Sequence, residues 1–221
     1  MIVSSSADIR EINADGILFK VRPPSVADSE KVIILLHGWT GDENSMWIFT
    51  PRLPGNALLL APRALYSAPQ IGYSWNQVVE GWPGMEDFLP AIKALLDLLR
   101  PARFPPGDFS SLHLAGFSQG AALAAVFALL YPEKVASLAM IAGFVPHGLE
   151  RLATSDRLKG MPTFVAHGTL DALVPVSQAR ETVGFLEKAG AQPVYCEDEV
   201  GHKLSANCFK GLDAFYRDQK F

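Results

Sequence analysis

Short apolar runs alternate with longer segments of helical pattern along the whole chain, and this alternation constrains the fold more than any other feature. Several runs are continuously apolar, which is typical of strands covered on both faces of a sheet. Strand–helix alternation builds βαβ units, so we predict an α/β fold with a mostly parallel, twisted sheet and helices on both faces. The candidate strands lie at residues 17–21, 31–36, 57–61, 111–115, 135–142, 162–167 and 193–197.

The segments between these runs have the patterns of helices. In residues 84–100, apolar side chains recur every three or four positions, and Pro101 ends the pattern. Residues 119–131 are apolar or small on every side, which predicts a buried helix. Residues 176–189 and 204–219 are expected to form surface helices.

Composition limits the class of protein. A chain of 221 residues with 49% hydrophobic residues has the length of one domain, residues 1–221, and is too apolar to be disordered. The net charge is −4 and the 19 Lys and Arg form no basic run, which argues against a nucleic-acid binder. No apolar stretch reaches the roughly 18 residues that span a bilayer, so we expect no integral membrane association.

The N-terminal sequence and the cysteines bear on location and metal binding. Residues 1–16 lack the basic start and apolar centre of a secretory signal. Cys196 and Cys208 are twelve positions apart, without the closely spaced pairs of a zinc site. Pairing of the two cysteines is an alternative, but without an export signal we expect reduced thiols, no metal and a cytoplasmic location.

A strong catalytic signal follows the candidate strand at 111–115. Gly116-Phe117-Ser118-Gln119-Gly120 has the G-x-S-x-G pattern between a strand and the small-residue helix, the context of a nucleophile elbow. Such a turn holds the serine in a strained backbone conformation, and its two glycines allow the strand and the helix to approach closely. Ser118 is therefore the candidate nucleophile.

A nucleophilic serine needs a base, and the base needs an acid that orients it. Asp171 comes directly after the strand at 162–167, and His202 comes after the strand at 193–197. Parallel strands present their carboxyl ends at one edge of a sheet, so these side chains are expected to meet Ser118 there. We predict a Ser118–His202–Asp171 triad.

Other acids and histidines remain alternatives at this stage. His147 and His167 are alternative bases, whereas His113 lies inside a strand and is expected to be packed. Asp198 is the alternative acid because it is close to His202 in sequence, although a solvated strand end would also explain it. Asp156 lies in a polar loop and is expected to be solvated.

The tetrahedral intermediate of acyl transfer needs two donors for its oxyanion. The residue after the nucleophile, Gln119, offers one backbone N–H. Gly38, in the loop after the strand at 31–36, allows the next amide to turn inward, so the N–H of Trp39 is the second candidate. An ordinary strand-ending turn is the alternative explanation of His37-Gly38.

Several motifs follow one another in order along the chain: LLHGWTGDE, APRALY with GYSW, GFSQGA, HGTLDALVP and GHKLS. Together they resemble the phospholipase/carboxylesterase family of α/β-hydrolases, which includes acyl-protein thioesterases and small bacterial carboxylesterases, over roughly residues 31–215. The resemblance implies the same triad, Trp39 and Gln119 as oxyanion donors, and hydrolysis of short- to medium-chain esters or thioesters. The resemblance, and no other feature of the sequence, also suggests a small homodimer.

Two positions depart from the family pattern. Ala121 follows the elbow where the family often has glycine, and Trp39 stands where a smaller residue or leucine is common. The Trp39 ring could narrow the site, which affects the substrate range and not the mechanism.

The substrate pocket must come mainly from loops, because residues 143–161 leave no room for a large cap domain. Aromatic residues are dense in the connections 39–49 and 62–83, and they could form an apolar acyl-binding wall or simply pack beneath the loops. The candidate substrate-binding residues are Tyr73, Trp75, Trp47, Phe144 and Leu173.

The sequence thus predicts a serine carboxylesterase without a cofactor, acting on small ester molecules, lipid-like ones included. Lysophospholipase and acyl-protein thioesterase activities are alternatives within hydrolases. A non-catalytic ligand-binding protein of the same fold is the alternative from a different class.

Overall fold

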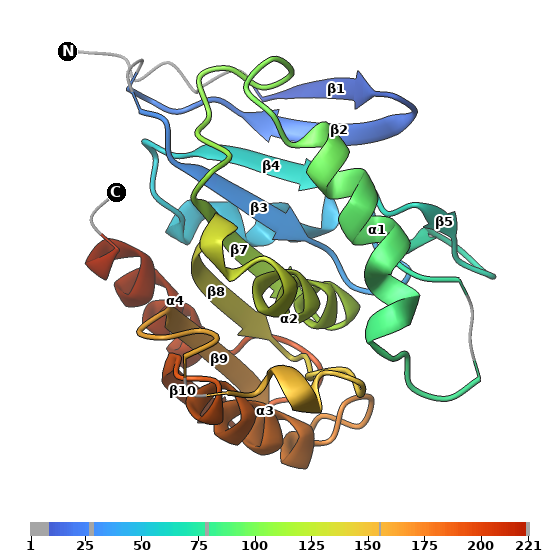
Figure 1. The fold of residues 1–221 in the computed structure, drawn as a ribbon, viewed down its shortest axis with the longest axis vertical. Helices are drawn as coiled ribbons and strands as arrows, with labels where there is room; N and C mark the ends of the chain where they lie inside the picture. Colours follow the sequence, from blue (N-terminus) through green and yellow to red (C-terminus); the bar gives the residue numbers. More distant parts are fainter. Residues whose placement is uncertain (1–8, 27–28, 78–79, 155, 220–221) are drawn as a thin grey trace.

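The computed structural model describes residues 9–26, 29–77, 80–154 and 156–219. Its centre is an eight-stranded twisted sheet with the order β1-β2-β4-β3-β7-β8-β9-β10 (Figure 1). The strands are β1 (Arg10–Ala14), β2 (Ile17–Arg22), β3 (Val32–Leu36), β4 (Leu58–Pro62), β7 (Leu112–Phe117), β8 (Val135–Ile141), β9 (Pro162–Gly168) and β10 (Gln192–Asp198).

The sheet is mostly parallel, as predicted. Strands β4, β3, β7, β8, β9 and β10 pair in parallel, whereas β1 pairs antiparallel with β2 and β2 antiparallel with β4. Every predicted strand is present, with ends within two residues of the expectation. Strand β1 was not predicted, because its sequence REINA is mostly exposed at the edge of the sheet and carries little apolar pattern.

Helices cover both faces of the sheet and match the predicted segments within two residues. They are α1 (Met85–Leu98), α2 (Gln119–Leu130), α3 (Val176–Lys188) and α4 (Ala206–Asp218). Helices α1, α2 and α3 bury side chains in one hydrophobic cluster, whereas α4 and the 3₁₀ helix η1 (Ser45–Arg52) contribute to a second.

The two clusters explain the continuously apolar strands. Along β3, Val32, Ile34 and Leu36 enter the first cluster, while Ile33 and Leu35 enter the second. Side chains alternate between the faces of a strand, so a strand buried on both faces must be apolar at every position.

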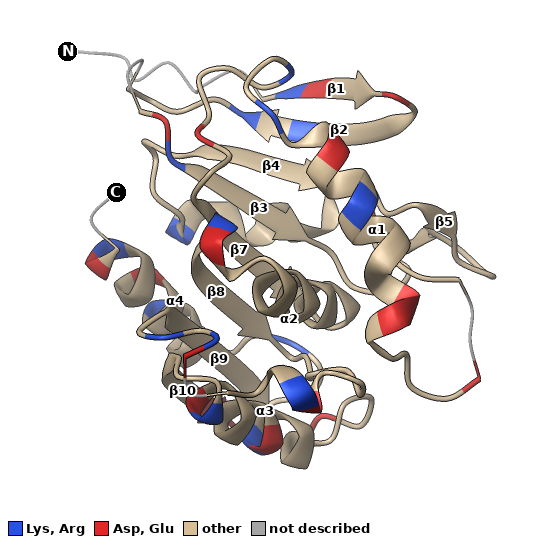
Figure 2. Cartoon of the chain, viewed as in Figure 1, with Lys and Arg blue, Asp and Glu red and all other residues tan. Residues whose placement is uncertain are grey.

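Helix α2 is the most deeply buried helix. Its residues from Gln119 to Leu129 are all buried, and it packs against β7 and β8. Figure 2 shows that this helix carries no charged side chain, while charges lie along the other helices and loops. The absence of a polar face, read from the sequence, correctly predicted this position.

The connections that follow the strands at the carboxyl edge contain no large inserted unit among the described residues. Between β8 and β9, the described residues form only the 3₁₀ helix η3 (Glu150–Leu152) and turns, without a large cap. The connection after β4 contains a small hairpin of β5 (Tyr66–Ser67) and β6 (Tyr73–Ser74), and η2 (Pro132–Lys134) precedes β8. Among the described residues, no helix is long and apolar enough to cross a membrane.

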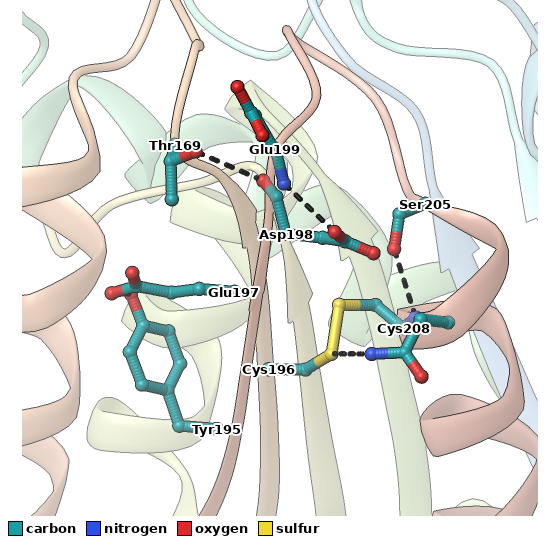
Figure 3. Close-up of a disulfide and its surroundings, with 9 residues drawn as sticks. Thr169, Tyr195, Cys196, Glu197, Asp198, Glu199, Ser205 and Cys208 are labelled. Carbon is teal, nitrogen blue, oxygen red and sulfur yellow. Dashed lines mark hydrogen bonds between the residues drawn. A yellow bond between two sulfur atoms is a disulfide. The ribbon is translucent and has the colours of Figure 1, made fainter.

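The expectation of two reduced thiols is wrong. Cys196 of β10 and Cys208 in the first turn of α4 form a disulfide, with their Cα atoms 5.7 Å apart (Figure 3). The cause is tertiary: α4 packs back against β9 and β10, which returns the chain to Cys196. A spacing of twelve residues in the sequence does not reveal this approach.

The disulfide gives a testable prediction for stability. Closing a loop of this length lowers the entropy of the unfolded chain, which is worth about 3 kcal/mol in the loop-closure model. The variant Cys196→Ala/Cys208→Ala is therefore expected to unfold at a temperature lower by roughly 6–12 °C, since each kcal/mol shifts Tm by about 2–4 °C at this chain length. Thermal unfolding followed by circular dichroism measures this shift.

Wild-type protein in a dithiol reductant is the matched control and should show the same loss as the double variant. Thiol titration of the unfolded, unreduced protein should find no free thiol. Two titratable thiols, or equal unfolding temperatures for wild type and variant, would contradict the disulfide.

Candidate active site

The turn between β7 and α2 holds Ser118 in an unusual backbone conformation. Its φ is 54° and its ψ is −118°, a region that residues with a side chain rarely occupy. Its N–H donates to the carbonyl of Ile141 at 2.8 Å, which ties the turn to the end of β8. The strained turn that the G-x-S-x-G pattern predicted is therefore present at this serine.

Glycine is required on both sides of this turn because backbones touch there. A Cβ atom on Gly116 would lie 2.3 Å from the carbonyl oxygen of Gly120. A Cβ atom on Gly120 would lie 2.1 Å from the carbonyl oxygen of Leu36 at the end of β3. Both distances are far below van der Waals contact, so a larger residue at either position would push the helix or the strands apart.

Asp171 and His202 form a close pair at the same edge of the sheet. The Asp171 carboxylate is buried, and its Oδ2 lies 2.6 Å from Nδ1 of His202. Its Oδ1 accepts the backbone N–H groups of Leu173 and Val174, each at 2.9 Å. The carboxylate is thus fixed by its own loop and holds Nδ1 of the imidazole, which leaves Nε2 for another partner.

The His202 ring packs beside the nucleophile turn. Its centroid is 4.9 Å from that of Phe117, the residue directly before Ser118. The loop that carries His202 crosses the end of β9, where the N–H of Leu170 donates to the carbonyl of Val200 at 3.0 Å. A Cβ on Gly168 would collide with the Val200 carbonyl at 2.1 Å, so only glycine permits this crossing.

The disulfide closes the loop that carries His202. This histidine lies six positions from Cys196 and six from Cys208, at the centre of the closed segment. The loop is therefore fastened at both ends as well as to the turn after β9. Figure 3 shows the hydrogen bonds of Asp198 and Ser205 on its two sides.

The two predicted oxyanion donors flank Ser118. A Cβ on Gly38 would lie 3.2 Å from the Cβ of Ser118, so the loop after β3 passes in contact with the serine, and Trp39 is the next residue. Gln119 is the first residue of α2, and the N–H of a first helical residue has no acceptor within its own helix. The helix dipole adds a partial positive charge at the same place.

The side chain of His37 supports this loop, a role that sequence reasoning missed. Its Nε2 accepts the N–H of Ala64 at 3.1 Å, so Nδ1 donates to the carbonyl of Gly38 at 2.7 Å. Burial lowers the pKa of His37, which favours this neutral form. The indole N–H of Trp75 also donates to the carbonyl of His37 at 2.7 Å.

The side chain of Gln119 has a second role that was not predicted. Its Oε1 accepts the N–H of Trp75 at 3.0 Å, and its Nε2 donates to Oγ of Ser74 at 3.0 Å and to Oδ1 of Asn76. The elbow is thereby fastened to the loop after β6. The sequence signal for this role was the amide side chain of Gln119 between the elbow serine and a helix of small residues, because a buried amide needs hydrogen-bond partners.

The predicted aromatic wall is divided between the core and the surface. Trp75 is only 1% exposed and belongs to the main hydrophobic cluster, so it packs beneath the loop and does not line an open surface. Trp47 packs partly buried against the second cluster, with Nζ of Lys20 5.0 Å from its ring. Tyr73 packs against the main cluster under the guanidinium of Arg63, at 4.6 Å.

The other candidate pocket residues lie at the carboxyl edge of the sheet. Leu173 is 69% exposed in the loop that holds Asp171, and Trp39 is 55% exposed. Phe144 follows the end of β8 and is largely buried, with the ring of Trp82 edge-on at 4.4 Å.

The alternative bases have other partners or positions. His113 is buried, and its Nδ1 lies 2.8 Å from Oγ of Ser137. His167 is buried beneath the acid loop: its Nε2 is 2.8 Å from the carbonyl of Val174 and 3.4 Å from Oδ2 of Asp171. His147 packs its ring against Gly84, before α1.

The alternative acids are also engaged elsewhere. Oδ1 of Asp198 accepts the N–H of the next residue, Glu199, at 2.9 Å. Asp156 is exposed in a turn, as expected. Of these acids, Asp171 is the one that contacts an imidazole at the open edge. Within the described part of the chain, no group of three or more His, Cys, Asp or Glu residues could hold a metal ion.

The fold and this sheet edge define an α/β-hydrolase. The sequence profile of the phospholipase/carboxylesterase family matches residues 19–217, and the chain belongs to that family. The expected family resemblance is thereby confirmed.

Relatives and solved structures are consistent with this family. A probable inactive carboxylesterase of Oryza sativa subsp. japonica, Os04g0669700, is 30% identical over 127 residues, covering 54% of this chain and 49% of the relative. Carboxylesterase SOBER1 of Arabidopsis thaliana is 29% identical over 112 residues, 48% of each chain. The chain therefore spans about half the length of these relatives. The Bacillus cereus carboxylesterase structure shares the fold with a TM-score of 0.81 at 23% identity, covering 93% of this chain and 95% of that one.

Buried His113 gives a prediction for the pH dependence of stability. Burial is the main cause that lowers its pKa to about 4, while the unfolded chain has the ordinary value near 6.5. The stabilisation is complete above pH 6.5 and is lost as the pH falls towards 4, because only the unfolded state takes up the proton in this window. The expected loss in free energy of unfolding is on the order of 3 kcal/mol.

Urea unfolding at several pH values between 7.5 and 4 measures this loss, and His113→Asn is the matched variant. The variant should depend less steeply on pH, although His37 keeps part of the slope because its pKa is also lowered. The same slope in wild type and variant would contradict the role of His113.

Proposed function

We propose that this protein is a serine carboxylesterase that hydrolyses short- to medium-chain carboxylic esters. The observation that carries the proposal is the 2.6 Å contact between Asp171 and His202, made at the sheet edge where Ser118 has its strained turn. A buried carboxylate that fixes an imidazole beside a serine is the arrangement that activates a hydroxyl. Membership of a hydrolase family supports the same reaction class.

In the proposed mechanism, Oγ of Ser118 attacks the ester carbonyl while Nε2 of His202 accepts its proton. Asp171 holds Nδ1–H and stabilises the imidazolium that forms. The oxyanion would be stabilised by the N–H groups of Trp39 and Gln119. His202 then protonates the leaving alcohol, and water hydrolyses the acyl-enzyme by the reverse sequence of proton transfers.

The proposed acyl pocket combines exposed and supporting side chains. Trp39 and Leu173 are exposed near the triad, and Phe144 follows the loop that touches the nucleophile turn. For Tyr73 and Trp47 we keep contact with substrate as a proposal, whereas Trp75 would support the pocket from beneath.

Within hydrolases, lysophospholipase and acyl-protein thioesterase activities are the competing proposals. Relative values of kcat/KM for simple esters, thioesters and lysophospholipids separate them. We expect simple esters to be the best substrates, because the described loops form no large cap that would enclose a long chain.

The cytoplasmic location stays a prediction, and the disulfide removes one of its supports, since reduced thiols were expected there. Homodimer formation and the expected lack of nucleic-acid binding are likewise predictions.

Replacement of the nucleophile tests the proposed function. Ser118→Ala removes the attacking oxygen, so esterase turnover is expected to fall on the order of 10⁶-fold, as for a triad serine elsewhere. The measurement is hydrolysis of p-nitrophenyl butyrate by the purified protein. A folded variant that keeps more than a tenth of the wild-type rate would overturn the assignment of Ser118.

A fluorophosphonate probe separates the enzyme from a non-catalytic binding protein of this fold. The name of the Oryza sativa relative, a probable inactive carboxylesterase, makes this alternative specific. In the wild-type protein, Oγ of Ser118 is expected to attack the phosphorus of the probe and displace fluoride, which leaves the phosphonyl group on the serine. The Ser118→Ala variant should stay unlabelled. A binding protein without an activated serine would not react.

The Trp39 ring gives a separate prediction about substrate range. Trp39→Ala keeps the backbone N–H, so it should change the preference for acyl-chain length more than it lowers the rate on the best ester. Values of kcat/KM for p-nitrophenyl esters from acetate to decanoate measure the effect, with Trp39→Phe as the control that keeps an aromatic ring. Complete inactivity of a folded Trp39→Ala protein would contradict this role.

A further inference from the structure

A second feature of the carboxyl edge is a cavity of about 350 Å³ between the segment before α1, the loop after β8 and helix α3. Its lining combines aromatic rings with carboxylates, and we call it the aromatic–acidic pocket. The residues that give it this character are Trp82, Phe144, Phe185, His147, Glu150 and Glu181.

Hydrogen bonds and close contacts join the walls of the pocket. The N–H of Met85 donates to the carbonyl of His147 at 2.9 Å, and a Cβ on Gly84 would lie 2.4 Å from Cε1 of the same histidine. On the other side, the N–H of Val145 donates to Oγ1 of Thr182, in α3, at 3.2 Å. The three elements are thus held together around the cavity.

Aromatic side chains come from each of the three elements. Trp82 and Phe144 have ring centroids 4.4 Å apart and an angle of 81° between their planes, so they form adjoining walls and not a stack. Phe185 of α3 adds a third ring to the lining. Rings arranged as adjoining walls can surround an organic cation, which is attracted to aromatic faces.

The fixed charges of the pocket are the carboxylates of Glu150 and Glu181. Both oxygens of the Glu150 carboxylate accept the N–H of Gly148, at 3.1 and 3.0 Å, and backbone hydrogen bonds lower the pKa of this group. Oε2 of Glu181 accepts a hydrogen bond from Gln178 at 3.1 Å. No Lys or Arg belongs to the lining formed by the described residues. The two carboxylates therefore have no Lys or Arg in the pocket to balance them, and the imidazole of His147 is the one basic side chain of the lining.

The pocket begins close to the nucleophile turn. Phe144 follows Gly143, where a Cβ would lie 3.2 Å from the carbonyl oxygen of Ser118 and 2.3 Å from Cβ of Ala121. One loop thus touches the elbow and forms the aromatic wall. A molecule bound against Phe144 would therefore lie one residue along this loop from the contact with the elbow.

We propose that the aromatic–acidic pocket binds the positively charged ammonium group of an ester substrate, while the ester carbonyl lies at Ser118. The substrate class is then an ester that carries a quaternary or primary ammonium group. This inference rests on the proposed esterase function, but the binding of a cation in the pocket does not depend on catalysis.

Two isosteric esters test whether the enzyme prefers a substrate with an ammonium group. Butyrylcholine and 3,3-dimethylbutyl butyrate differ by the replacement of the ammonium nitrogen with carbon, so only the charge changes. We expect kcat/KM to be about tenfold higher for the charged ester, from cation–π and carboxylate attraction. In Glu150→Gln/Glu181→Gln the ratio should fall below about threefold, and Trp82→Ala should lower it as well. Glu187→Gln, on an exposed part of α3 outside the pocket, is the matched control and should keep the wild-type ratio.

Binding of tetramethylammonium tests the pocket without turnover. Saturation-transfer NMR on Ser118→Ala protein, at constant ionic strength, should detect a bound cation that is lost in the triple variant with Glu150→Gln and Glu181→Gln. The Ser118→Ala protein should bind tert-butanol much more weakly than tetramethylammonium, since tert-butanol has a similar shape but no charge.

The outcomes separate this inference from the proposed function. Equal kcat/KM for the two esters, with hydrolysis intact, would overturn the ammonium site and leave the esterase standing. If no ester is hydrolysed, the esterase proposal fails, and the pocket is then judged by tetramethylammonium: glutamate-dependent binding supports a cation site, and no binding overturns it. Circular dichroism of each variant confirms that a lost ratio does not come from unfolding.

Discussion

The contact between the backbones of Gly116 and Gly120 is the constraint on which the rest of the site depends. It allows strand β7 to turn directly into helix α2, with Ser118 between them at a positive φ of 54°. Because Gly120 also lies against the end of β3, the same contact brings the loop of Trp39 beside the serine. A Cβ on either glycine would therefore disturb the nucleophile turn and the proposed oxyanion donors together.

The loops around this turn are held by buried polar groups and by one covalent link. His37 joins the loop after β3 to the residues after β4, and the side chain of Gln119 joins the elbow to the loop after β6. Asp171 is oriented by backbone N–H groups of its own loop, and the His202 loop is closed by the disulfide between β10 and α4. Such restraints hold the side chains of a site in one geometry before a substrate binds, which is what catalysis by orientation requires.

The sequence predicted the features that depend on local pattern. Continuous apolar runs predicted the parallel strands, and the small residues after Ser118 predicted a buried helix. Strand ends also predicted which edge carries Asp171 and His202, because parallel strands finish on the same side.

Features that depend on tertiary contacts were not predicted. The pairing of the two cysteines arises from the packing of α4 on β10, and Trp75 is buried in the main cluster with its indole N–H bonded to the carbonyl of His37. Neither contact leaves a signal in residue spacing.

The central claim is that Ser118, His202 and Asp171 act together on an acyl carbon, and a crystal structure after reaction with a phosphonate ester tests it most directly. We predict phosphorus bonded to Oγ of Ser118, Nε2 of His202 within hydrogen-bonding distance of that oxygen or of the leaving-group position, and the phosphonyl oxygen facing the N–H groups of Trp39 and Gln119. Phosphorus on another residue, or an imidazole of His202 turned away from the modified serine, would contradict the account.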